Sequence, residues 1–187
     1  MLLSLIVASL LVMGSPGPST ISVTAVGAAF GLSRSLAYLS GLVAGTIAVL
    51  LAVAAGVVSI LLAVPQLASV LLAASAAYIL YLAYRIATAL PLSTHDEAVA
   101  PPSFLSGMLL AVANPKAYVA IAAVFGGSTL DAALKIVVLV AMIVLIHLAW
   151  WLAGASFSWV FYDPAASRIV NGAFAVALVA TTVLAFF

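Results

Sequence analysis

Apolar segments long enough to cross a lipid bilayer follow one another along almost the entire chain. A membrane-spanning helix needs about 20 predominantly apolar residues. Charged residues and groups of proline and glycine divide the sequence into six such segments, at residues 2–30, 35–63, 66–90, 103–125, 132–160 and 165–187. A transmembrane β-barrel would instead show segments of about ten residues with alternating polarity. The sequence therefore predicts an all-α polytopic membrane protein with six transmembrane helices.

The scarcity of charge excludes several other classes of protein. Of the 187 residues, 68% are hydrophobic and 5% are charged, whereas a soluble domain carries about a quarter of charged residues. We therefore expect the lipid bilayer as solvent, and we read the first apolar segment as a retained span because it lacks a basic leading region. A net charge of +1 without clustered basic residues indicates no nucleic-acid partner. The absence of cysteine excludes thiolate metal sites, and we predict no metal and no cofactor.

The chain divides into two halves that resemble each other. A polar linker at residues 91–102 separates residues 1–90 from residues 103–187. Landmark residues recur in the two halves at a nearly constant spacing: Pro18 with Pro115, Gly56 with Gly154, and Pro65 with Pro164. Because each half holds an odd number of spans, the second half enters the membrane from the opposite side. This is the inverted-repeat arrangement of many secondary transporters; the alternative is a chance match between residues that often mark the ends of spans.

The distribution of basic residues predicts the orientation. Arg34, Arg85 and Arg168 lie beside the first, third and fifth connections, whereas only Lys135 lies beside the fourth. Connections rich in lysine and arginine stay in the cytoplasm. We therefore expect the odd connections on the cytoplasmic side of the cytoplasmic membrane and both termini on its outer side.

Proline interrupts the first and the fourth predicted span. Pro16, Gly17 and Pro18 should end the first helix near Met13 and let it restart at Pro18, because proline removes a helical hydrogen bond and suits the first turn of a new helix. In the fourth span, Asn114 is a good N-cap and Pro115 a good first residue. We predict that both helices are broken inside the membrane.

Restarted helices expose free N–H groups and the positive end of the helix dipole. Two such ends from oppositely inserted halves would form a site for an anionic group such as a carboxylate. The predicted substrate-binding residues are those at the two breaks: Pro16, Gly17, Pro18, Ser19, Thr20, Asn114, Pro115 and Lys116. The alternative is a pair of packing kinks, since proline is tolerated in membrane helices.

Lys116 lies deep in its span, where a charged side chain facing lipid would cost a few kcal/mol. No acidic side chain lies deep in any predicted span. Its ammonium group is therefore expected to contact water or the anionic group of a ligand. The alternatives are a structural charge facing an internal cavity and a side chain that extends to the interface.

Four further residues have two interpretations each. His147, near the middle of the fifth span, either carries a proton or bonds a neighbouring helix. Gly41 and Gly45 have the small-xxx-small spacing of closely packed helices, a face that also permits a homodimer; a substrate-facing surface is the alternative. Tyr78 either belongs to an interfacial belt with Tyr81, Tyr84 and Arg85 or reaches a substrate cavity.

These features together resemble the LysE/RhtB branch of the lysine exporter superfamily. The resemblance rests on Met13-Gly14-Ser15-Pro16-Gly17-Pro18, on Phe30-Gly31-Leu32, on Gly41 and Gly45, on Ala76 to Arg85, on Phe104 to Met108 and on Asn114-Pro115-Lys116-Ala117. It implies proton-driven export of amino acids or their derivatives, with the first and fourth spans lining the pathway. Where basic-amino-acid exporters of this kind carry an acidic residue after Gly45, this chain has Thr46, which disfavours a cationic substrate.

The predicted function is therefore proton-coupled export of amino acids or related small metabolites across the cytoplasmic membrane, by alternating access between the two halves. An enzyme is not expected, because two distant histidines do not form a catalytic cluster. The alternatives are a passive channel and a membrane subunit that does not itself transport.

Overall fold

The computed structural model describes residues 1–57, 63, 65–88, 100–157, 159 and 163–183. In these ranges every regular element is helical: α1 (Leu2–Ala8), the π-helix η1 (Ser9–Met13), α2 (Pro18–Ala54), α4 (Pro65–Ala87), α5 (Phe104–Ala113), α6 (Pro115–Gly126), α7 (Ala132–Ser156) and α8 (Pro164–Val183). The predicted all-α class is confirmed for this part of the chain. Most of the predicted linker, residues 89–99, lies outside the described residues.

The first predicted span is broken at the predicted place. The helix ends at Met13 and restarts at Pro18. Helix α2 then continues through the first connection, where Gly31 has a φ of 71° and bends the chain. Because only glycine adopts this left-handed conformation without strain, Gly31 marks the boundary between the first and second predicted spans.

The fourth predicted span is also broken. Helix α5 ends at Ala113, α6 begins at Pro115, and the two axes differ by 62°. Asn114, between them, has the extended backbone of an N-cap residue. The predicted break is therefore confirmed at the predicted residue.

Two of the described helices, α2 and α7, are long and apolar enough to cross a membrane, and the bent pair α5–α6 is a third if it counts as one span. The described residues include three shorter apolar helices, at residues 2–13, 76–87 and 164–180. The structure is thus that of an all-α protein with membrane-spanning helices. The number of six spans and their arrangement as an inverted repeat stay predictions.

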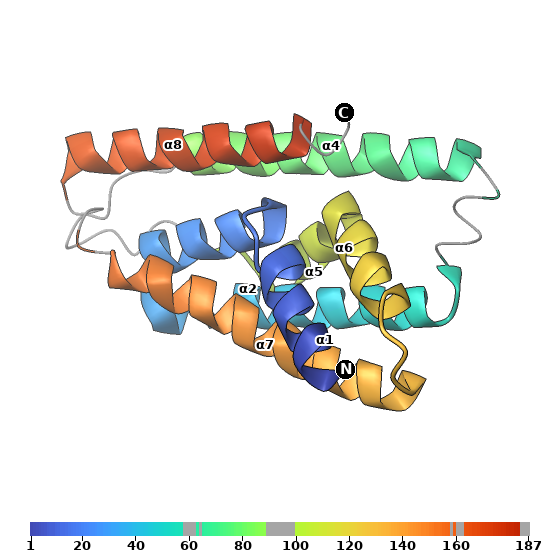
Figure 1. The fold of residues 1–187 in the computed structure, drawn as a ribbon. Coiled ribbons are helices and arrows are strands. Elements are labelled where there is room, and N and C mark those ends of the chain that lie inside the picture. The colour runs from blue at the N-terminus through green and yellow to red at the C-terminus, as the bar shows by residue number, and fades with distance from the viewer. Residues whose placement is uncertain (58–62, 64, 89–99, 158, 160–162, 184–187) are drawn as a thin grey trace.

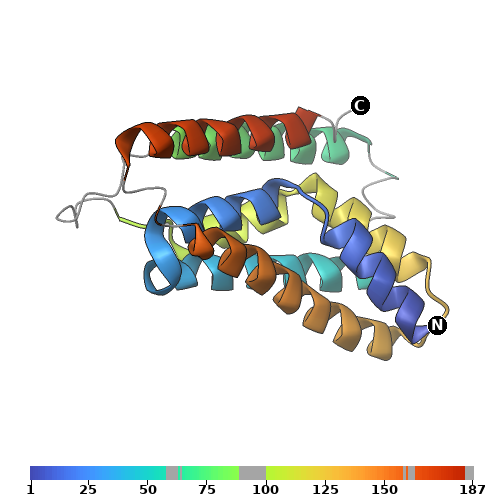
Figure 2. The same ribbon diagram turned by 60° about the vertical axis from the view of Figure 1, so that its left-hand side comes forward.

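The helices form two layers (Figures 1 and 2). Helices α4 and α8 lie side by side and antiparallel, and together they cover the layer formed by α1, α2, α5, α6 and α7. Within the larger layer, the interrupted segment α1–α2 runs in the opposite direction to α5–α6, so that the two breaks meet near the middle (Figure 2). A core that includes Tyr38, Leu42 and Leu110 packs α2 against α5.

Gly41 and Gly45 lie where α2 contacts α5. A Cβ atom on Gly41 would overlap the main-chain oxygen of Phe104, and one on Gly45 would lie 2.7 Å from that of Met108. Because these two glycines have no side chain, the backbones of α2 and α5 are in direct contact. This agrees with the interpretation of Gly41 and Gly45 as helix-packing residues. Because this face of α2 packs against α5 of the same chain, it offers no surface for a homodimer. A homodimer stays a prediction without an assigned interface.

Candidate functional site at the two helix breaks

The two breaks are joined by a hydrogen bond between the capping residue of α6 and the first turn of α2. Asn114 Nδ2 donates to Ser19 Oγ over 2.9 Å, across 95 residues of sequence. Both side chains are buried. The same asparagine caps α6, since its Oδ1 accepts from the main-chain N–H of Lys116 at 3.1 Å. One side chain therefore starts a helix in one half and contacts the helix start of the other half.

The Pro-Gly-Pro loop is held by its own helix start. The N–H of Gly17 donates to Thr20 Oγ1 at 2.9 Å, and the same hydroxyl donates to the oxygen of Gly17 at 3.1 Å. Gly17 has extended backbone and precedes Pro18, the first residue of α2. Thr20 thus supplies the half of a capping box in which the side chain of the third helical residue accepts from the N–H of the N-cap residue.

Lys116 bridges from the second break to the first. Its Nζ donates to Ser15 O at 2.6 Å, to Ser15 Oγ at 2.8 Å and to Pro16 O at 2.8 Å. These bonds occupy the three donors of an ammonium group. Two of the acceptors are main-chain oxygens of the Pro-Gly-Pro loop, which proline leaves without helical partners. In this conformation the partners of Lys116 are oxygen atoms of the opposite break, which the sequence analysis did not consider. Its contact with a ligand anion stays a prediction.

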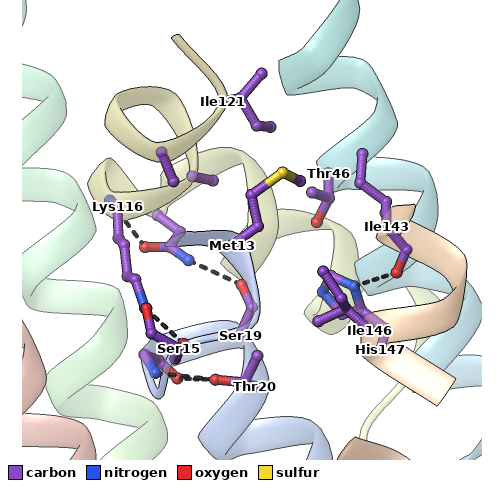
Figure 3. A pocket seen from close by; sticks show the side chains of 14 residues that line it. Met13, Ser15, Ser19, Thr20, Thr46, Lys116, Ile121, Ile143, Ile146 and His147 are labelled. Atoms are coloured by element: carbon purple, nitrogen blue, oxygen red, sulfur yellow. Dashed lines mark hydrogen bonds between the residues drawn. The ribbon is translucent and has the colours of Figure 1, made fainter. Parts of the chain in front are cut away.

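A cavity lies beside the breaks (Figure 3). Its volume is about 40 Å³, which is room for about three water molecules. The predicted residues Gly17, Ser19, Thr20, Asn114 and Lys116 all line it. In Figure 3, Lys116 and Ser15 lie on one side of the cavity, and Thr46 and His147 lie on the opposite side.

His147, on α7, is brought to this cavity with one ring nitrogen unpaired. Nδ1 lies 2.8 Å from the main-chain oxygen of Ile143, one helical turn earlier. Nε2 is buried, and it has no hydrogen-bond partner among the described residues. The interpretation that His147 bonds a neighbouring helix finds no partner in the part of the chain that the structure covers.

Tyr78 does not join the site at the breaks. Its hydroxyl donates to Ser106 O at 2.7 Å, and the side chain lines a separate cavity of about 250 Å³ together with Tyr81 and Arg85. The geometry thus separates Tyr78 from the residues with which the sequence analysis grouped it. Arg85 contacts Tyr81 through a hydrogen bond of 2.9 Å.

Two tryptophans of α7 also support the first half of the chain, a role that the sequence analysis did not assign. Trp150 Nε1 donates to the main-chain oxygen of Gly14 at 3.1 Å, and Trp151 Nε1 donates to Ser35 Oγ at 2.7 Å. Gly14 lies directly after the end of η1, where main-chain oxygens lack helical partners. The available signal was the depth of two indole N–H donors in an apolar helix, since such donors need an acceptor when they are buried.

The sequence matches a known protein family over nearly its whole length. The model of the family described as LysE type translocator matches residues 10–186, a range that includes both breaks and the cavity. Neither a curated protein nor a solved structure matches the chain.

Proposed function

The chain belongs to the LysE type translocator family, whose members move small molecules across membranes, and from this premise we propose that it exports amino acids or related metabolites. The export crosses the cytoplasmic membrane, is driven by the proton gradient and proceeds by alternating access. The substrate carboxylate binds where Ser19, Thr20, Asn114 and Lys116 line the cavity.

The observation that carries this proposal is the bonding of Lys116. Its ammonium group donates to uncharged oxygens, and the described residues that line the cavity include no carboxylate. Hydrogen bonds between two ionised groups are roughly twice as strong as neutral ones. A substrate carboxylate that enters the cavity is therefore a better acceptor for this lysine than the loop oxygens.

The helix starts add to the preference for an anion. Helices α2 and α6 both begin at the breaks, at Pro18 and Pro115, and the N-terminal end of a helix carries a partial positive charge. Two such ends and one ammonium group therefore lie at one cavity, and none of the described residues that line it is acidic. An anionic substrate group balances this charge.

The bonds of Lys116 support a mechanism of alternating access. Nζ joins the α6 start to the loop before α2, which are 101 residues apart in the sequence. Transfer of the lysine to a substrate carboxylate removes three contacts between the two interrupted segments. The segments can then separate, and a cavity with room for about three waters enlarges to admit a solute.

Proton coupling needs a group that titrates near neutral pH inside the pathway, and His147 is the candidate proton carrier. It lines the same cavity as Lys116, so that a proton and a substrate would share one compartment. Thr46, at the position where basic-amino-acid exporters of this kind carry an acidic residue, also lines this cavity. A hydroxyl there favours neutral amino acids over cationic ones.

Efflux from proteoliposomes tests the proposal. Purified protein is reconstituted into liposomes that are loaded with labelled amino acids. Efflux is measured with and without a proton gradient directed into the liposomes. We expect efflux of at least one neutral amino acid against its concentration gradient when the pH gradient is present. Downhill movement alone would indicate a passive channel, and no movement of any amino acid under either condition would overturn the exporter assignment.

A further inference from the structure

The tautomer of His147 is fixed by its main-chain partner. Nδ1 lies 2.8 Å from the oxygen of Ile143, and a carbonyl oxygen can only accept a hydrogen bond. Nδ1 therefore carries the hydrogen. In the neutral ring the second nitrogen, Nε2, then has a lone pair and acts as an acceptor.

This acceptor is buried at the wall of the cavity without a partner. His147 is 5% exposed, and Nε2 has no hydrogen bond within the described part of the chain. A buried polar atom without a partner is unfavourable, and in a native protein it calls for an explanation such as a functional role or a bound molecule. The group that pairs with His147 Nε2 must be a hydrogen-bond donor.

Thr46 presents a second acceptor to the same cavity. Its hydroxyl donates to the main-chain oxygen of Leu42 at 2.8 Å, so its single hydrogen is already used. The oxygen keeps lone pairs for a further donor. His147 and Thr46 lie together on one side of the cavity, opposite Lys116 and Ser15 (Figure 3).

The two walls of the cavity are thus chemically opposite. One wall presents the ammonium group of Lys116 and two helix starts, whereas the other presents acceptor atoms of His147 and Thr46. We infer that the cavity binds a zwitterion, with the substrate carboxylate at Lys116 and the substrate ammonium group donating to His147 Nε2 and Thr46 Oγ1. This inference rests on the proposed function and specifies which solutes it covers: those that carry an anionic group and a protonated amine.

The same contact provides the coupling to protons. A proton on Nε2 turns this atom from an acceptor into a donor and gives the ring a positive charge, so a proton and a substrate ammonium group exclude each other. The proton leaves Nε2 for water when the substrate binds and returns after the substrate has left. Lys116, on α6, is the other ionisable side chain among the described residues that line the cavity; α2 and η1 contribute Thr20, Thr46 and Met13, which do not titrate.

Two substitutions separate this role from a purely structural one. His147→Leu removes the acceptor, whereas His147→Gln keeps an acceptor oxygen near the position of Nε2 but cannot carry a proton at neutral pH. Leu145→Ala is the matched control, because Leu145 is also on α7 and is 58% exposed. The measurements are exchange of a labelled neutral amino acid across proteoliposomes at equal pH, and efflux driven by a pH gradient.

We expect His147→Leu to slow exchange by about tenfold or more, the loss that follows from one charge-assisted hydrogen bond. His147→Gln should keep exchange within about threefold of the wild type and lose the stimulation by a pH gradient. Exchange at the wild-type rate in His147→Leu would overturn the inference, and so would equal losses in both variants when both elute as folded protein.

Analogues of the substrate give a second test that needs only the wild type. The 2-oxo acid of the transported amino acid lacks the ammonium group, and its methyl ester lacks the carboxylate. Each should compete with exchange at least about tenfold more weakly than the amino acid itself. Equal competition by the 2-oxo acid would overturn the zwitterion inference and leave the exporter assignment standing. A wild type that moves no amino acid would instead overturn the exporter assignment, on which the inference rests.

Discussion

Lys116 Nζ lies 2.6 Å from the main-chain oxygen of Ser15, a residue 101 positions earlier in the sequence. This contact joins the start of α6 to the point where the first interrupted helix ends. The carboxyl end of a helix carries a partial negative charge, so the ammonium group stabilises the break that it contacts. The lysine is therefore part of the structure of the closed site as well as the candidate ligand of the substrate.

Replacing this lysine should abolish transport. In Lys116→Ala the candidate site loses its cation, and the oxygens of Ser15 and Pro16 lose their donor. The bond to Ser15 is half-buried and the bond to Pro16 is exposed. Their loss should therefore cost less than the about 1–3 kcal/mol of a fully buried acceptor without a partner, and the variant should be less stable but still fold. Amino-acid efflux from proteoliposomes and thermal unfolding in detergent measure the two effects.

Lys135→Ala is the control for this variant. Lys135 also donates to main-chain oxygens, those of Phe125 at 3.1 Å and Ser128 at 3.2 Å, but it does not line the cavity. The control should lose some stability and keep transport. If Lys116→Ala transports at the wild-type rate, lysine does not belong to the site.

Gly17 leaves room for the side chain of Lys116. A Cβ atom on Gly17 would lie 2.7 Å from Lys116 Cδ and 2.9 Å from Nζ. Because the backbone of Gly17 is extended, alanine strains nothing locally, and its effect must pass through the lysine. Gly17→Ala should therefore displace the ammonium group and reduce transport several-fold, with a loss of stability no larger than that of Lys116→Ala.

The control for Gly17→Ala is Gly172→Ala, on α8. A Cβ atom at Gly172 would meet nothing within 4 Å, and alanine in a helix is favoured over glycine by about 1 kcal/mol. This variant should transport normally and unfold at the same or a higher temperature. Normal transport by Gly17→Ala would show that the position of Lys116 is not critical.

The contrast between the breaks and the partners of Lys116 shows what could be predicted from the sequence. Proline acts within a few residues of itself, so the end at Met13, the restart at Pro18 and the break at Asn114 all follow from local chemistry. The partners of Lys116 do not, because they come from the other half of the chain. The prediction considered acidic side chains and omitted the main-chain oxygens that the opposite break itself sets free.

Tyr78 shows a second limit. In a soluble helix the polar residues reveal which side faces the core, but a membrane helix is apolar on all sides. The sequence therefore indicated how deep Tyr78 lies, and it could not indicate which neighbour the ring faces. The structure turns it toward Ser106, away from the cavity at the breaks.

The contact of α2 with α5 predicts a large effect on stability. Gly41→Ala places a methyl group against the main-chain oxygen of Phe104, where neither backbone can move without shifting its helix. Such overpacking costs about 1–3 kcal/mol. The apparent unfolding temperature in detergent should fall below that of Gly172→Ala, whatever the oligomeric state; an unchanged temperature would contradict the close contact of the two helices.

The bond between Asn114 and Ser19 offers a direct measure of how strongly the two breaks are coupled. Ser19→Ala removes the acceptor of this bond, and Asn114→Ala removes the donor together with the cap of α6. In a double-mutant cycle the cost of the lost cap cancels, so the free energy of interaction should be about 0.5–1.5 kcal/mol, the net value of one buried hydrogen bond. Thermal or denaturant unfolding of the wild type, the two single variants and the double variant gives this value. Strictly additive losses would mean that the bond between Asn114 and Ser19 does not couple the two helix starts.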